Sequence, residues 1–156
     1  MELLEFIARL EEKLESQYRT PDLGNYDSPI DEIVYLILCT KTSSSKVKKA
    51  FRRVKKIIQK WDSSDLDSAK LIEVLKPLGN SQKRANQIVD AITHLNQVCS
   101  CNLEFLRTKS DKEVYDFLIS IPHVGQKIAH CVMLFCLDRN YLPVDTHITR
   151  ILKRLS

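Results

Sequence analysis

LISIPHVGQKIA, residues 118–129, is the stretch of the chain that decides the fold. Pro122 closes the apolar run that precedes it, and a second apolar run, residues 128–137, begins shortly after Gly125. Because Pro and Gly interrupt helices, the pattern predicts two helices joined by a short hairpin at residues 122–125. Taken alone, such a turn is more often an ordinary connection between helices than a binding motif.

Helix start signals recur on both sides of this hairpin. Ser110 and Glu113 match a capping box, and Ser28 followed by Pro29 is a second start signal. Only three glycines are present, fewer than an all-β or Gly-rich nucleotide-binding fold usually needs. We therefore expect an all-α fold with about eight helices.

The chain is expected to divide into two parts. Residues 1–20 form an amphipathic helix, with Ile7, Leu10 and Leu14 on one face. A stretch with two prolines and one glycine then breaks the pattern. Residues 28–156 form the helical core, which contains the two helices of the hairpin at about residues 111–137.

Positive charge is concentrated in one predicted helix. Residues 41–60 contain nine Lys and Arg side chains and no Asp or Glu, whereas the whole chain has a net charge of only +4. Apolar residues of this predicted helix, including Phe51, Ile57 and Trp61, are expected to face the core. The basic face suits a phosphate backbone, and a solvated surface explains it equally well.

Five cysteines without a paired spacing indicate a reducing compartment. Neither a signal peptide nor an apolar run of about 18 residues is present, so we expect an intracellular protein.

Several motifs resemble the helix-hairpin-helix DNA glycosylase superfamily. Residues 118–129 resemble its hairpin, and Leu142-Pro-Val-Asp145-Thr-His147 resembles its Val-Asp-Thr-His segment, at the Lys-to-Asp spacing of the endonuclease III branch. Residues 77–85, PLGNSQKRA, are similar to a Gly-x-x-x-x-Lys-Ala helix start, and residues 37–42, ILCTKT, to a substrate-side loop. The resemblance covers residues 28–156 and implies the six-helix barrel core of that superfamily.

The resemblance implies that Lys127 and Asp145 form the catalytic pair. In lyase-competent members the Lys attacks the sugar C1′, expels the base and forms a Schiff base that permits β-elimination. The Asp helps to deprotonate the Lys and stabilises positive charge on the sugar. Without the resemblance, Lys127 is explained as a solvated lysine and Asp145 as a helix N-cap.

A DNA-binding surface is also implied by this resemblance. Unpaired N–H groups at a tight turn that opens a helix attract a phosphate oxygen without sequence preference. The expected contacts are Lys41, Lys46, Lys49, Lys83, Arg84, His123, Val124, Gly125 and Gln126. Two of them depart from the family pattern: His123 replaces a Gly of the hairpin, and Lys41 replaces a Gln that fills the gap left by the flipped base.

We expect no metal and no iron-sulfur cluster. Many relatives carry four cysteines beyond the last helix, and the superfamily fold continues past the point where this sequence stops. The five cysteines here do not have the cluster spacing: Cys39, Cys99, Cys101, Cys131 and Cys136. A zinc site could combine His130 with Cys99, Cys101 and Cys131, which are the right ligand types. The spacing of these four residues fits no structural zinc pattern.

The resulting hypothesis is a bifunctional DNA glycosylase and abasic-site lyase of base-excision repair, acting on oxidised pyrimidines in duplex DNA. One alternative is a non-catalytic DNA-binding module. Another is one subunit of a split or oligomeric glycosylase, in which a second polypeptide or a second copy covers the N-terminal helix. A fragment of a longer enzyme also remains open.

Overall fold

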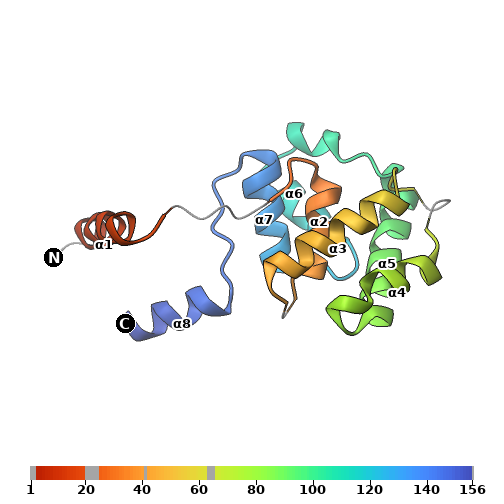
Figure 1. Ribbon diagram of the computed structural model, residues 1–156. Helices are drawn as coiled ribbons and strands as arrows, with labels where there is room; N and C mark the ends of the chain where they lie inside the picture. Colours follow the sequence, from red (N-terminus) through yellow and green to blue (C-terminus); the bar gives the residue numbers. More distant parts are fainter. Residues whose placement is uncertain (1–2, 20–24, 41, 63–65, 156) are drawn as a thin grey trace.

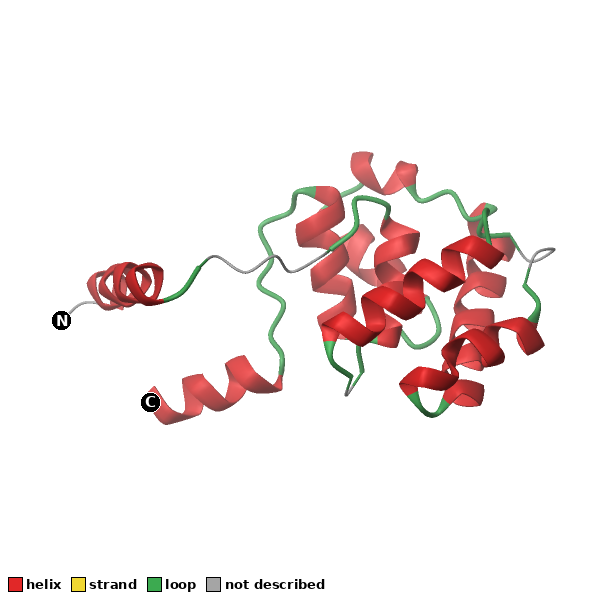
Figure 2. Cartoon of the chain, in the orientation of Figure 1, coloured by secondary structure: helices red, strands yellow, loops and turns green. Residues whose placement is uncertain are grey.

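Figure 1 shows the computed structural model of the chain, in which the described parts are residues 3–19, 25–40, 42–62 and 66–155. Within these ranges the secondary structure is entirely helical, with no strand (Figure 2), so the predicted all-α fold is confirmed. The helices are α1 (Leu3–Gln17), α2 (Pro29–Leu38), α3 (Ser44–Ile57), α4 (Ser68–Leu75), η2 (Lys76–Leu78), α5 (Ser81–Cys99), η3 (Glu104–Thr108), α6 (Asp111–Ser120), α7 (Gln126–Leu137) and α8 (Thr146–Leu155).

The predicted start signals act as expected at two helices. Ser28 precedes α2, which has Pro29 in its first turn. Ser110 and Glu113 form a reciprocal capping box at the start of α6, each side chain accepting the backbone N–H of the other residue. These caps fix where the helices begin, and the second one sets the first helix of the hairpin in place.

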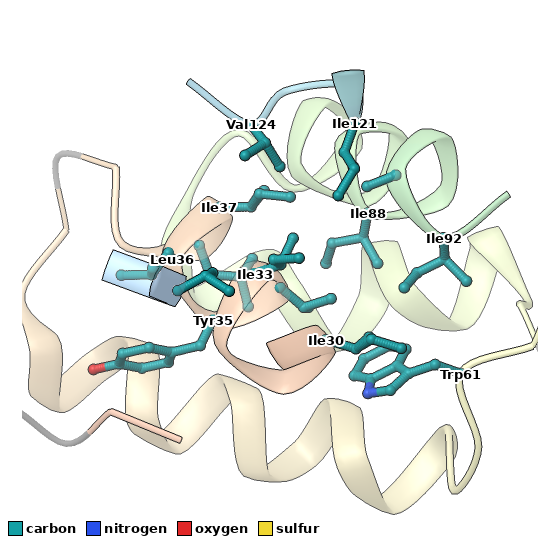
Figure 3. Packing of buried hydrophobic residues seen from close by; sticks show 14 of the residues in the cluster. Ile30, Ile33, Tyr35, Leu36, Ile37, Trp61, Ile88, Ile92, Ile121 and Val124 are labelled. Atoms are coloured by element: carbon teal, nitrogen blue, oxygen red, sulfur yellow. The ribbon is translucent and has the colours of Figure 1, made fainter. Parts of the chain in front are cut away.

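Helix α2 is the centre of the core. It packs against α3, α5 and α7, while α4 packs on α5 and α6 packs on α7. Its inward residues include Ile33, which is fully buried, and Ile37, and Figure 3 shows them surrounded by side chains from the neighbouring helices. The apolar run of this helix is thus explained by burial on nearly all sides.

The basic segment ends its helix earlier than expected. Helix α3 stops at Ile57, which is 37% exposed, so the prediction that Ile57 faces the core is wrong. Ile58 has an extended backbone, and Ile58 and Trp61 both belong to the buried core. Figure 3 shows Trp61 among these core side chains. Lys55 is also held in the structure, because its ammonium pairs with Asp31 at 2.8 Å and lies over the Trp61 ring.

The first and last helices stand away from the packed body (Figure 1). Three apolar side chains of α1, those of Leu4, Ile7 and Leu14, are each at least 47% exposed. Helix α8 exposes Ile151 and Leu152 in the same way. None of the described helices combines the length and the apolar character that a bilayer crossing requires.

Candidate active site

Lys127 and Asp145 line one cavity of about 420 Å³. Lys127 lies in the first turn of α7, directly after the hairpin, and Asp145 lies just before α8. Figure 1 shows the segment after α7 running back beside this helix towards α8, and the two side chains line the same space. The volume falls within the range of about 300–1,000 Å³ that small-molecule pockets usually have.

Asp145 caps α8. Its Oδ1 accepts the backbone N–H groups of His147 and Ile148, both at 2.9 Å. The hydrogen bond from Ile148 is the main cause that lowers the pKa of Asp145, and the positive charge of Lys127 adds to this effect. The carboxylate is therefore ionised at neutral pH, and Oδ2 has no hydrogen-bond partner among the described residues.

The ammonium of Lys127 has no salt bridge with any carboxylate in the described part of the chain. Its positive charge nevertheless lowers the pKa of several neighbouring groups. Burial raises the pKa of the Cys39 and Cys131 thiols, and Lys127 opposes this rise in both. Lys127 therefore lines the cavity without an ion pair to any described carboxylate, and the ionised Asp145 lines the same cavity.

A buried carboxylate supports the wall behind the lysine. Glu32 of α2 is fully buried, and it accepts the N–H of Tyr26 at 2.8 Å and the side-chain amide of Asn25. Burial raises the pKa of Glu32, while these two hydrogen bonds and the charge of Lys127 oppose that rise. Because Asn25 itself lines the cavity, Glu32 fixes the position of one polar wall residue.

The rest of the cavity is mostly apolar. Its polar side chains besides Lys127 and Asp145 are few. The lining comes from α2, α3, α7, α8 and the segments beside them: Asn25, Tyr35, Leu36, Cys39, Ser44, Cys131, Leu134, Phe135, Leu142, Pro143 and Ile148. An apolar pocket with a small number of polar groups suits a flat, uncharged ring that is held by a few hydrogen bonds.

The hairpin has the geometry that its sequence suggests, with His123 in the left-handed region at φ 66°. The imidazole Nε2 lies 2.8 Å from an Asp90 carboxylate oxygen of α5, which ties the turn to the neighbouring helix. Gly125 caps α7 without a side chain and, with Gln126, is exposed, so the first N–H groups of α7 are open to solvent. Val124 differs from expectation, because its side chain is buried and its N–H donates to the Ile121 carbonyl.

The other expected DNA contacts divide into two groups. Lys46, Lys49 and Lys83 are exposed, and Ser44 at the start of α3 connects the basic helix to the cavity. Arg84 contradicts the expectation, because only 7% of it is exposed and its guanidinium donates to Leu38, Thr40, Thr42 and Gly79. Lys41 lies outside the described residues.

Sequence reasoning did not identify Asn25 and Tyr35 as site residues. Tyr35 and Cys39 are four residues apart in the apolar run of α2, a spacing that places both on one helix face and could have indicated a shared wall. Asn25 offered no such signal. The described residues contain no group of three or more His, Cys, Asp and Glu side chains that could hold a metal ion.

Comparison with known proteins finds similar sequences and similar solved structures. No protein-family model matches the chain. The Arabidopsis thaliana protein named "Putative DNA glycosylase At3g47830" is 34% identical over 132 residues, which make up 83% of this chain and 45% of that protein. Endonuclease III of Sulfolobus acidocaldarius is 34% identical over 80 residues, 51% of this chain and 32% of the enzyme.

Among solved structures, a non-covalent endonuclease III–DNA complex has a similar fold, with a TM-score of 0.79 and 19% identity over 99% of this chain and 69% of that one. An all-helical barrel with the hairpin and the capped Asp defines a helix-hairpin-helix protein. The chain belongs to the helix-hairpin-helix DNA glycosylase superfamily. It spans less than half of the length of the two relatives described above.

Proposed function

We propose that this chain acts in base-excision repair as a DNA glycosylase with abasic-site lyase activity, in which Lys127 is the nucleophile. The single observation that carries the proposal is that Lys127 and Asp145 line the same cavity without an ion pair between them. An amine with a nearby carboxylate and space for a nucleotide is the arrangement that attack on a sugar carbon needs.

The chemistry follows from these two side chains. Asp145 helps to remove a proton from the Lys127 ammonium, and the freed electron pair of Nζ attacks C1′ of the nucleotide. The bond from C1′ to the base breaks, and the base leaves with the electron pair of that bond and takes up the proton that Nζ loses on forming the new bond. Opening of the sugar ring gives a Schiff base, and loss of a C2′ proton then expels the 3′ phosphate. Asp145 is ionised, and its Oδ2 stabilises positive charge that develops on the sugar.

Duplex DNA is the proposed partner, with oxidised pyrimidines as the substrate class. The exposed N–H groups after Gly125 and the side chains of Lys46 and Lys49 would bind phosphates. The target base must leave the stack, since C1′ is not accessible within a duplex, and the apolar cavity would receive it. Lys127 and Asp145 supply the nucleophile and the charge stabilisation, so the proposed reaction includes neither a metal nor an iron-sulfur cluster.

A split arrangement is a second candidate, because α1 exposes Leu4, Ile7 and Leu14. An isolated helix of about 12–15 residues is only marginally stable in water, so α1 requires a packing partner. In that arrangement a second polypeptide, or a second copy of the chain, would cover α1.

Borohydride trapping on duplex DNA with an abasic site tests the proposal. The wild-type chain should form a covalent adduct that is lost in Lys127→Ala. The control variant Lys70→Ala, which changes an exposed lysine of α4, should retain the adduct. Asp145→Asn should slow the reaction. Binding to DNA without an adduct would support a non-catalytic module, and an adduct that forms only with a co-purified polypeptide would support the split arrangement.

A further inference from the structure

Arg84 is the most heavily engaged buried cation of the described chain. Its Nη1 donates to the Leu38 carbonyl at 2.7 Å, and its Nη2 donates to the Thr40 carbonyl at 3.0 Å and to Thr42 Oγ1 at 2.8 Å. Its Nε donates to the Gly79 carbonyl at 3.0 Å. A single guanidinium therefore joins the turn after α2 to the turn before α5.

A buried guanidinium is not the simplest group to fill the space between these two turns. A buried charge is costly unless it is paired, and no described carboxylate forms a salt bridge with Arg84. The guanidinium instead binds carbonyl oxygens at the end of α2, where the helix dipole is negative. An apolar side chain of similar volume would often be as favourable for stability, so a positional role is the better explanation for a cation here.

The turn that Arg84 holds is part of the candidate active site. Cys39 lies between Leu38 and Thr40, and Ser44 comes two positions after Thr42. Both Cys39 and Ser44 line the cavity with Lys127 and Asp145. Thr42 is engaged twice more, because its N–H donates to the Cys39 carbonyl and its hydroxyl to the Thr40 carbonyl. The wall of the cavity thus continues directly into the hydrogen bonds of Arg84.

We propose that Arg84 is a positioning residue, which fixes the turn after α2 against α5 and so sets the shape of the cavity wall that Cys39 and Ser44 form. It does not touch the substrate itself. The proposal rests on the proposed function for its kinetic consequence, and it has a structural consequence that needs no activity. Lysine cannot replace Arg84 fully, because its single ammonium cannot span four acceptors on two turns.

The test compares Arg84→Met with Lys70→Met, an exposed lysine of α4 that neither lines the cavity nor belongs to the expected DNA contacts. We expect Arg84→Met to bind abasic-site duplex with nearly wild-type affinity, because the hairpin is unchanged. Its single-turnover adduct formation should be about 10- to 100-fold slower, the loss expected from a small displacement of reacting groups. Hydrogen exchange should become faster in peptides that cover the turn after α2 and stay unchanged in peptides of α7.

Two further variants keep the test decisive if Arg84→Met unfolds. Arg84→Lys should retain the fold and give an intermediate rate. Arg84→Ala should regain part of its rate on addition of guanidinium chloride, with sodium chloride at equal concentration as the control for salt effects on DNA binding.

The outcomes separate the two proposals. Wild-type exchange in the turn together with a wild-type rate in folded Arg84 variants would overturn the positioning role. A wild-type chain that forms no adduct would overturn the proposed function alone, and the exchange measurement would then still decide whether Arg84 holds the turn.

Discussion

The hairpin places His123 in a conformation that favours glycine, and this predicts how its variants will differ in stability. A left-handed backbone costs a non-glycine residue about 1–2 kcal/mol, which His123→Gly would recover. Glycine also gains freedom in the unfolded chain, which offsets about 0.4–1 kcal/mol of that gain. The His123 side chain is 34% exposed and that of its partner Asp90 is 54% exposed. Loss of their contact therefore costs about 0–1 kcal/mol.

His123→Gly should therefore lie within about 1 kcal/mol of the wild type. His123→Ala loses the same Asp90 contact but keeps the backbone strain, so it should be less stable than His123→Gly by about 0.5–1 kcal/mol. Urea unfolding of the three proteins at one pH measures both differences. If His123→Ala equals or exceeds His123→Gly in stability, the left-handed conformation at this position is refuted.

Three other perturbations test the core, the buried carboxylate and the basic helix. Leu118→Ala, at a fully buried position of α6, should cost about 2–5 kcal/mol in urea unfolding, and the half-exposed neighbour Ile119→Ala only about 0.5 kcal/mol; equal losses would contradict the packing. Burial raises the pKa of Glu32 above its ordinary value of 4.5, so the folded state binds the Glu32 proton more tightly than the unfolded chain does. The stability that comes from this tighter binding is lost as the pH rises through the raised pKa. Glu32→Gln should accordingly gain stability relative to the wild type as the pH rises above about 4.5, and a difference independent of pH would argue against the burial effect. Replacing both Lys46 and Lys49 by Gln should lower the slope of log affinity against log salt by about 1 for each phosphate contact that is lost, whereas an unchanged slope would place DNA elsewhere.

Local sequence signals predicted much of the fold. The capping box of Ser110 and Glu113 and the cap at Ser28 fixed helix starts, because each depends on side chains within one turn of the chain. The end of α3 was not predicted correctly, since Ile57 continues the helical pattern and only the tertiary packing of Ile58 and Trp61 decides where the helix stops. Tertiary contacts therefore overruled periodicity at that point.

The site shows the same division between local and distant information. Lys127 and Asp145 were identified by motif and spacing, and the structure brings both to one cavity. The inward direction of Arg84 was not predictable, because its acceptors on α2 lie more than forty positions away in sequence. Nothing near Arg84 in the sequence distinguishes it from the exposed Lys83.

Peptide mapping of the borohydride-trapped adduct is the most direct measurement of the central claim. After digestion of the protein and the DNA, the account predicts that the sugar remnant is attached to Nζ of Lys127. A remnant found on Lys83, on another lysine or on the N-terminal amine, with Lys127 unmodified, would contradict it.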